Sequence, residues 1–417
     1  MSQTPRALHV HVLVDLEWTA QSGGQVTCWQ RLAGAAVDVP HLHLTLHAQG
    51  APHDSRDLLP NLKLILHKPI FSTRNIPFLH TPAHTDLASY HPGLAAALEG
   101  ADVIHTTDGY FAYAQTAEKI SAAKNIPMTH SVHTDTISYS RIFTRRFFEK
   151  ALGAFGRLID DIFGISKGVG NNMQHRLARH ESLCQYVLVS REEDRHLAAC
   201  ALSPERVRSY RLGLDREQFD PARRDRAAFC AHYNIPQNSI VVMFVGRLDE
   251  GKNIHRLIAG MEAAIKNGAP LYLFAAGLGP AEKDIHARLK GHAVTPGFLS
   301  PDDLSLAYAS ADWLALPSTV ETWSLVAEEA LASGLPVIAS CGSGVGRFLG
   351  AEGAGLLVRE DNDMAWEAAL IEACGLQDME RLRKLARSAA LAQFPGWVEA
   401  LTHDFLPAWQ LAAEEGR

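Results

Sequence analysis

The chain has 417 residues, 47% of them hydrophobic and 20% charged, and its formal net charge is −7. At roughly 100 to 200 residues per domain, this length predicts two or three domains with packed cores and excludes a mini-protein or a disordered tail. The balance of 39 Lys and Arg against 46 Asp and Glu argues against nucleic acid as the main partner. The acid excess lies in the second half, because residues 1–220 hold 22 side chains of each sign and residues 221–417 hold 17 basic and 24 acidic ones.

The cysteines and the apolar runs indicate the compartment. The six cysteines are Cys28, Cys184, Cys200, Cys230, Cys341 and Cys374. Their spacing fits neither a zinc site nor a disulfide framework, so we expect reduced thiols. No apolar run reaches the ~18 residues of a membrane span, and the first one, residues 7–14, is interrupted by His9 and His11. The sequence therefore predicts a soluble, unprocessed protein of the cytoplasm.

In chain order, the first half alternates short apolar runs with helical stretches. A strand is expected from Ala7, followed by a glycine turn at 22–24 and a helix whose apolar residues recur at helical spacing. Further buried strands are expected over 41–47, 62–66, 101–107, 126–133, 161–166 and 185–190, with helices over 110–124 and 167–179. Strands that alternate with helices predict a parallel sheet covered on both faces.

The same alternation begins again at Ser239. A strongly apolar strand is followed by a helix from about Asn253, and further strands are expected over 271–279, 313–318 and 335–340. We therefore expect an amino-terminal domain over 1–215, a charged linker over 216–238 and a carboxyl-terminal domain over 239–417. Because ligands bind outside the carboxyl ends of parallel strands, two such sheets facing one another would enclose one cleft.

Two cations lie at the predicted edge of that cleft. Gly246 and Arg247 end a strand, and Lys252 opens the next helix, which is a context in which diphosphates are commonly held. The alternative, an exposed Arg and Lys in an ordinary loop, stays open on these residues alone.

The segment 317–336 indicates a strand end, a turn and a helix that stops at a glycine. Glu321 and Glu329 are eight residues apart, so an intervening helix would separate their backbones by roughly 12 Å. That is too far for the ~5 to 5.5 Å carboxylate pair of a retaining glycosidase. The two glutamates could instead contact one extended ligand at two points. The alternative is a helix N-terminus whose glutamates are exposed to solvent.

This segment resembles the E-x7-E signature of glycosyltransferase family 4, and residues 246–253, GRLDEGKN, resemble that family's phosphate-binding turn. Three looser likenesses agree with it: the glycine loop at 22–24, the HTD-type loop at 131–135 and the domain-linking pattern at 212–221. The resemblance implies the GT-B architecture of two facing Rossmann-like, doubly wound α/β domains. It also implies a metal-independent, retaining transfer of a hexose from a UDP- or GDP-linked donor, without a cofactor, to a sugar, lipid or lipid-linked acceptor.

The resemblance also implies roles for single residues. The catalytic residues would be Arg247 and Lys252 at the diphosphate, Glu321 at the donor sugar and His133 at the transferred sugar. Donor binding would involve Gly23, Gly24, Gly246, Gly297, Phe298, Leu299, Trp323, Ser324, Leu325 and Glu329, the last at the ribose. Trp323 and Ser324 depart from the Phe and Gly that are usual there, which leaves the donor sugar open.

Other patterns suggest less. Asp361-Asn362-Asp363 is formally a D-x-D metal motif, but its position favours a turn and a helix N-cap. The histidine sets 41, 43, 47 and 130, 133 (with Asp135) are more typical of hydrogen-bonded or surface residues than of metal ligands. Gly277-Leu278-Gly279 lacks the third glycine of a dinucleotide motif.

The sequence leaves two alternative functions open. A nucleotide-sugar 2-epimerase of the same fold, or a non-catalytic sugar-nucleotide-binding homologue, would use the same architecture.

Residues 141–158 carry five cations and one acid among phenylalanines and other apolar residues. Such a segment can lie at the inner face of a membrane and bring a lipid acceptor to the enzyme, or it can be an ordinary domain helix.

Overall fold

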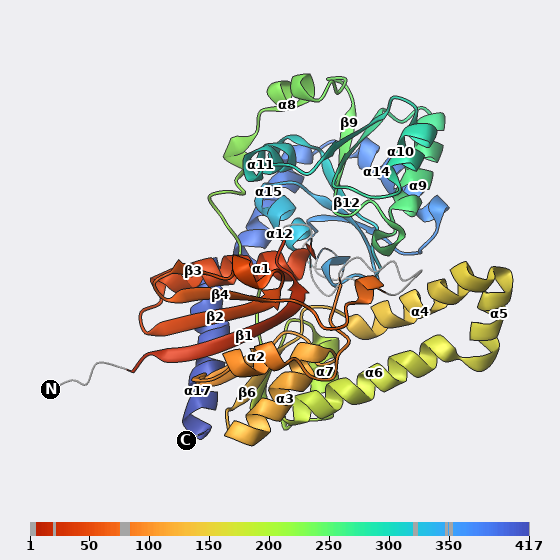
Figure 1. Ribbon diagram of the computed structural model, residues 1–417. Helices are drawn as coiled ribbons and strands as arrows, with labels where there is room; N and C mark the ends of the chain where they lie inside the picture. The colour runs from red at the N-terminus through yellow and green to blue at the C-terminus, as the bar shows by residue number, and fades with distance from the viewer. Residues whose placement is uncertain are drawn as a thin grey trace. The chain divides into compact units, whose positions relative to one another are not determined.

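The computed structural model describes residues 6–19, 22–75, 84–319, 324–346, 349 and 353–416. The chain forms two compact units, which Figure 1 shows in ribbon form. The first unit combines Met1–Gly213 with Trp397–Arg417, and the second unit is Leu214–Gly396. Each unit is an α/β layer structure with its own sheet.

The first unit is built on an eight-stranded sheet. Its strands are β1 (Leu8–Glu17), β2 (Leu42–Gln49), β3 (Arg56–Leu59), β4 (Leu62–His67), β5 (Val103–Thr106), β6 (Met128–Ser131), β7 (Tyr186–Val189) and β8 (Val207–Ser209). The order is β3-β4-β2-β1-β5-β6-β7-β8, and β3 is the antiparallel member. Strand order reverses between β1 and β5, which is the topological switch point of a doubly wound sheet.

Helices flank this sheet. They are α1 (Gly24–Ala35), α2 (Pro92–Ala97), α3 (Ala112–Lys124), α4 (Thr136–Leu152), α5 (Ala154–Phe163), α6 (Ile165–Ser182), α7 (Glu192–Ala198), α16 (Trp397–Ala400) and α17 (Leu406–Glu415), with a π-helical turn at Leu401–Phe405. Strands β5, β6 and β7 are buried throughout, as expected for a sheet covered on both faces. Figure 1 shows α4, α5 and α6 extending away from the sheet as an arm.

The second unit has a six-stranded, all-parallel sheet. Its strands are β9 (Ile240–Val245), β10 (Leu271–Ala276), β11 (Ala293–Gly297), β12 (Trp313–Leu316), β13 (Val337–Ser340) and β14 (Gly355–Val358), in the order β11-β10-β9-β12-β13-β14. This is the Rossmann order, with its switch point between β9 and β12. Its helices are α8 (Arg226–His232), α9 (Ile254–Lys266), α10 (Glu282–Leu289), α11 (Pro301–Ser310), α12 (Leu325–Ala332), α14 (Asp363–Gly375) and α15 (Met379–Gln393).

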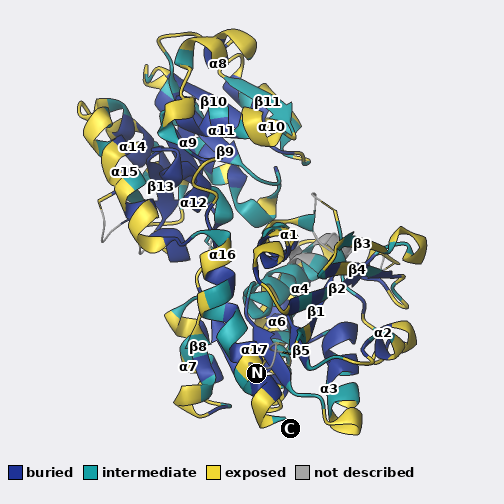
Figure 2. Ribbon diagram, turned by 90° about the vertical axis from the view of Figure 1, so that its left-hand side faces the viewer, coloured by how far each residue is buried: buried dark blue, intermediate teal, exposed yellow. Residues whose placement is uncertain are grey.

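Alternation along β9 builds a core on each face of this sheet. Val241 and Met243 enter one apolar cluster, whereas Val242 and Phe244 enter the other, because successive strand residues point to opposite faces. Figure 2 shows β10 and β13 in the buried colour and exposed residues on the outer helices, α8, α14 and α15 among them. The apolar run that began the second half of the sequence is therefore a central strand.

Short 3-10 turns complete the chain. They lie at Ala36–Asp38, Pro52–Asp54, Thr73–Asn75, Pro204–Arg206, Pro221–Arg223 and Glu250–Lys252.

The domain boundaries differ from the predicted ones. The predicted linker 216–238 belongs to the second unit, where Phe219 and Phe229 are buried in the core. The end of the chain returns to the first unit, where Trp409 Nε1 donates to His105 Nδ1 at 3.2 Å and the Tyr186 hydroxyl donates to Glu415 at 2.6 Å. These contacts join residues about 230 to 300 positions apart in the sequence, so no local pattern could indicate them.

One predicted strand is wrong. Residues 161–166 contain the end of α5 and the start of α6, with Gly164 between them in the left-handed conformation at φ 60°. Phe155, Leu158 and Ile162 recur at helical spacing and are 65%, 50% and 66% exposed, so the apolar run faces solvent instead of a sheet.

Candidate functional site

Three glycines meet at the carboxyl ends of β9, β10 and β11. Gly246 donates its backbone N–H to Ala276, and Gly277 donates to Gly297 at 2.8 Å. A Cβ on Gly277 would lie 1.9 Å from the carbonyl oxygen of Gly246, so a larger residue cannot occupy that position. The backbone is thereby open along this edge of the second sheet, where a ligand can approach closely. The Gly277-Leu278-Gly279 segment lacks a full dinucleotide motif, and its glycines allow this close approach of neighbouring backbone segments.

Asp249 organises the turn after β9. Arg247 Nε donates to Asp249 Oδ2 at 2.9 Å, and Asp249 Oδ1 accepts the backbone N–H of Lys252 at 3.1 Å. Asn253 follows in the left-handed conformation at φ 56°, and its amide donates to the carbonyl of Pro317 at 3.0 Å. The two predicted cations thus lie on one turn, tied to the loop after β12. That is the switch point of the sheet.

Glu329 lies one turn inside α12 and is 6% exposed. The Tyr308 hydroxyl donates a hydrogen bond of 3.0 Å to Glu329 Oε2. At the start of the helix, Ser324 is the N-cap and accepts the backbone N–H of Ala327, while Leu325 is the first helical residue. Glu321 and Trp323, two of the predicted site residues, lie outside the described residues.

The predicted base-binding residues follow β11. Gly297 ends the strand at φ 78°, Phe298 is 54% exposed, and Leu299 packs against the core. An exposed aromatic ring beside a strand end is a platform on which a flat ring can stack.

The D-x-D segment has a structural role. Asn362 is the N-cap of α14, Asp361 accepts the amide of Asn253 at 2.8 Å, and Asp363 pairs with Arg256 at 2.8 Å. The turn and N-cap interpretation is therefore confirmed. Within the described ranges, no group of three His, Cys, Asp or Glu side chains is arranged to hold a metal ion.

In the first unit, Gln25 links the glycine turn to two strand ends. Gly23 is the N-cap of α1 at φ 94°, and Gly24 is the first helical residue. Gln25 donates to Thr107 Oγ1 at 2.9 Å and accepts from Thr134 Oγ1 at 3.5 Å. The turn is therefore held beside the loops that follow β5 and β6.

His133 lies in the loop after β6 and is fixed through both ring nitrogens. Ser131 Oγ lies 2.7 Å from Nε2, and the Tyr210 hydroxyl lies 3.2 Å from Nδ1. The ring packs against Trp29. Desolvation lowers the pKa of His133 to about 3, so the imidazole is neutral near pH 7. Both ring nitrogens are therefore occupied, so a sugar hydroxyl could bond to this imidazole only in exchange for Ser131 or Tyr210.

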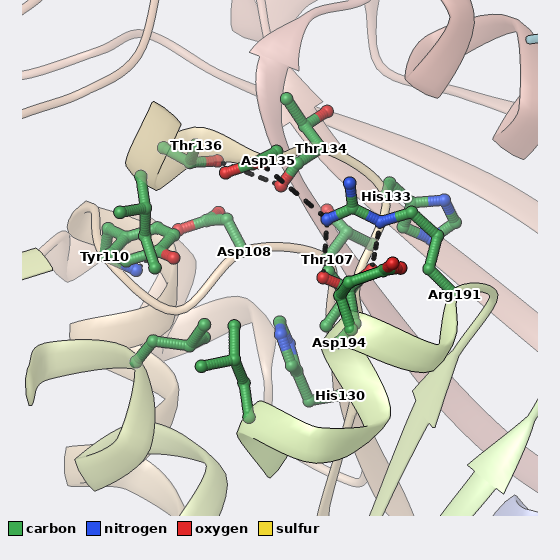
Figure 3. A pocket seen from close by; sticks show the side chains of 15 residues that line it. Thr107, Asp108, Tyr110, His130, His133, Thr134, Asp135, Thr136, Arg191 and Asp194 are labelled. Atoms are coloured by element: carbon green, nitrogen blue, oxygen red, sulfur yellow. Dashed lines mark hydrogen bonds and ion pairs between the residues drawn. The ribbon is translucent and has the colours of Figure 1, made fainter. Parts of the chain in front are cut away.

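A cavity of about 150 Å³ opens beside His133, inside the first unit. It lies at the carboxyl ends of β5, β6 and β7, and Figure 3 shows the side chains that line it. The sequence indicates a ligand at such strand ends, but its patterns singled out only His130, His133 and Asp135 of this lining. Tyr110, Arg191 and Asp194 were missed: Tyr110 follows β5, whereas Arg191 and Asp194 follow β7, and only the sheet order brings them together.

The two sheets define a protein of the GT-B fold class. The structure of sucrose-phosphate synthase from Thermosynechococcus elongatus matches 98% of this chain and 97% of its own, with a TM-score of 0.67 at 19% identity. An Anabaena structure determined in complex with UDP and glucose matches 97% of this chain and 98% of its own, with a TM-score of 0.62 at 16% identity. At these identities the likeness establishes the fold.

Residues 225–390, which lie within the second unit, match the family model of glycosyl transferases group 1. Among the curated relatives, a D-inositol 3-phosphate glycosyltransferase of Catenulispora acidiphila is 32% identical over 245 residues, 55% of this chain. The chain spans about half the length of the curated relatives it matches, 57% in this case.

Proposed function

We propose that this chain is a retaining hexosyltransferase that uses a UDP- or GDP-linked sugar and needs no metal ion. The observation that carries the proposal is the glycine-lined edge of the second sheet. There Arg247 and Lys252 lie on one turn, and the buried carboxylate of Glu329 lies in α12. Within a group 1 domain, these residues offer two cations for a diphosphate and one carboxylate for ribose hydroxyls.

In the proposed reaction, an acceptor hydroxyl forms a bond to the anomeric carbon of the donor sugar. The bond from that carbon to the phosphate oxygen breaks, the diphosphate leaves with its electron pair, and the acceptor proton passes to the departing phosphate. Negative charge grows on the leaving group, so preorganised cations and the amides at the start of α12 stabilise the transition state most. Attack on the face that the diphosphate leaves gives retention.

Arg247 is held for this role. Its Nε is engaged by Asp249, which fixes the guanidinium, while its two Nη groups have no partner in the part of the chain that the structure describes. Those two Nη groups can donate hydrogen bonds to a phosphate in a bidentate arrangement. Phe298 supports a nucleotide base, because its exposed ring is a stacking surface beside Gly297.

The acceptor side of the proposal uses the first unit. His133 would contact the transferred sugar, and Gly23 and Gly24 would allow the loop to approach the phosphates. The arm adds a surface for a lipid or lipid-linked acceptor, because the apolar side chains of α5 are exposed, with Phe163 at 73%. We propose that this arm contacts an anionic membrane, consistent with the net positive charge of residues 141–158. Within the described residues, no helix is long and apolar enough to cross a membrane.

The test is a panel of UDP- and GDP-hexoses incubated with the full chain. Binding is read as thermal stabilisation, turnover as release of UDP or GDP, and product anomer by proton NMR. One donor should raise the melting temperature and release its nucleoside diphosphate, with the anomeric configuration kept in the product. Conversion of the donor into its 2-epimer would indicate the isomerase instead, and binding without turnover for every acceptor would indicate a non-catalytic homologue.

A further inference from the structure

The cavity of the first unit is lined by more negative than positive side chains. Its carboxyl groups belong to Asp135, Glu193, Asp194 and Asp108, the last with a pKa that burial raises, and its one cationic side chain is Arg191. The two imidazoles, His130 and His133, add no charge at neutral pH, because burial lowers the pKa of each.

Arg191 is already engaged by carboxylates of the cavity wall. Its Nε and Nη2 donate to both oxygens of Asp194 at 2.8 and 2.6 Å, and Nη2 lies 3.8 Å from Asp135. Figure 3 shows the guanidinium between the two aspartates. The pair with Asp194 offsets the charge of Arg191, so a phosphate bound by the remaining Nη1 group would lie close to carboxylates.

The helix starts at the cavity are also occupied by acids. Helix N-termini attract anions, because their first backbone N–H groups have no partner within the helix. At α4, Asp135 is the N-cap and accepts from the backbone N–H and the hydroxyl of Ser138. At α7, the first turn carries Glu192, Glu193 and Asp194. A phosphate at either helix start would meet carboxylates.

Two polar side chains of the cavity wall are almost completely buried. Tyr110 is 4% exposed, and its hydroxyl has no hydrogen-bond partner among the residues that the structure describes. His130 is 1% exposed, and its Nδ1 lies 3.1 Å from the carbonyl oxygen of Thr106, which can only accept. In the tautomer that donates from Nδ1 to this carbonyl, Nε2 is an acceptor. A ligand hydroxyl satisfies both kinds of group.

We propose that this cavity binds the acceptor and selects it by charge: it takes a hydroxyl-bearing sugar or polyol that is neutral or carries an ammonium group, and it rejects a phosphorylated one. The inference rests on the proposed transferase function, because it names the class of acceptor for the same reaction. It sets this chain apart from a relative named for the acceptor D-inositol 3-phosphate.

The test measures binding of matched ligands to the full chain by saturation-transfer NMR. The pairs are glucose against glucose 6-phosphate, glucosamine against glucosamine 6-phosphate, and inositol against inositol 3-phosphate. At least one unphosphorylated compound should bind at least about tenfold more tightly than its ester, a difference of about 1.36 kcal/mol, since the phosphate would meet like charges in a partly buried site. Equal or tighter binding of the esters, or no binding by any pair, overturns the proposal.

Two matched pairs of variants locate the effect. Glu193→Lys should reduce the preference against phosphate several-fold, whereas Glu192→Lys, which makes the same charge change at an exposed neighbour outside the cavity lining, should not. Tyr110→Phe should weaken sugar binding about fivefold without lowering the melting temperature. Tyr113→Phe removes a buried hydroxyl that also has no partner among the described residues but lies outside the cavity lining, and this change should leave sugar binding unchanged. Equal effects within either pair would refute the assignment to the cavity.

UDP and GDP binding is measured in the same samples. If the chain binds neither nucleotide but still prefers unphosphorylated sugars, the result contradicts the transferase function and supports the charge selection. If the chain binds a nucleotide but prefers the phosphate esters, the result contradicts only the charge selection.

Discussion

The Tyr308 hydroxyl is hydrogen-bonded to Glu329 Oε2 at 3.0 Å, and the tyrosine is completely buried. A carboxylate that is buried needs such a donor, because an unsatisfied charge in a core is costly. The bond joins α11 to α12, so it sets the direction in which the second oxygen of Glu329 can point. Tyr308 is therefore a positioning residue for the proposed ribose contact.

Replacement of Glu329 by Ala should weaken UDP or GDP binding by at least about tenfold, since hydrogen bonds to a charged group are worth about 1.5 to 3 kcal/mol. Tyr308→Phe should weaken it less, by about threefold, because the carboxylate remains but loses this hydrogen bond. Isothermal titration with the nucleotide measures both. Tyr272→Phe is the control, a buried tyrosine in the same unit whose hydroxyl has no partner among the described residues. An unchanged dissociation constant for Glu329→Ala would remove the ribose role.

Arg247→Ala and Lys252→Ala should each reduce turnover by at least about 100-fold with the fold intact, because each removes a charge from the departing diphosphate. Turnover is measured as nucleoside diphosphate release at saturating donor. Arg256→Ala and Lys266→Ala are matched controls, since their side chains pair with Asp363 and Glu262 on the surface. Near-normal rates in both site variants would be incompatible with a phosphate role.

The turn around Arg247 and the helix that carries Glu329 could be predicted from sequence, because apolar runs, glycines and charges there follow one another locally. Tyr308 could not be predicted, since it lies 21 positions from its partner in another helix. Gly277 was undervalued for a similar reason: its need for glycine comes from Gly246, on the neighbouring strand. The acceptor-side cavity depends on loops that only the sheet order brings together.

Apolar content misled the interpretation of residues 161–166. A short apolar run predicts a buried strand only when both faces are covered, and here Ile162 and Phe163 are 66% and 73% exposed on the arm. The return of residues 397–417 to the first unit also escaped prediction, because a domain that is discontinuous in sequence leaves no composition change at its boundary.

Turnover should persist after EDTA treatment. The charges of the diphosphate are met by side chains and by helix-end amides in the proposed site, and Asp361 and Asp363 are engaged by Asn253 and Arg256. The measurement is nucleoside diphosphate release with EDTA, and again after Mg²⁺ or Mn²⁺ is added back. Asp363→Ala should retain activity. Activity that EDTA abolishes and a divalent ion restores would contradict metal independence and return attention to these aspartates.

The arm should bind vesicles that contain anionic lipid and release them as salt is raised, because screening weakens attraction between surface charges. In sedimentation assays, the double change Phe155→Ser with Phe163→Ser should abolish binding, and Arg145→Glu with Arg146→Glu should weaken it. Leu183→Ser is the control, since Leu183 is 49% exposed but follows the far end of α6. No binding at low salt would leave a soluble acceptor as the better model.

Three buried histidines in neighbouring strands should make the protein acid-sensitive. His11 Nδ1 lies 3.0 Å from His47 Nε2, and His47 Nδ1 lies 3.0 Å from His67 Nε2. Burial lowers the pKa of His11 and of His67 from 6.5 to about 4. Burial also lowers the pKa of His47 well below its usual value, and the charges of His11 and His67 act in the same direction. Lys63, which repels a second positive charge, acts in the same direction.

Because the folded-state pKa values lie below the unfolded value of 6.5, the unfolded chain binds more protons as the pH falls below that value. The free energy of unfolding should therefore be at its full value above about pH 6.5 and decrease towards pH 4. Each pKa unit corresponds to about 1.36 kcal/mol, so one histidine of this kind represents on the order of 3 kcal/mol. Urea unfolding between pH 7 and pH 4 measures the slope. His11→Asn and His67→Gln keep an amide near the bonded nitrogen and should flatten it, whereas His53→Gln, at an exposed site, should not. A slope that is the same in all of these variants would assign the acid sensitivity to other groups.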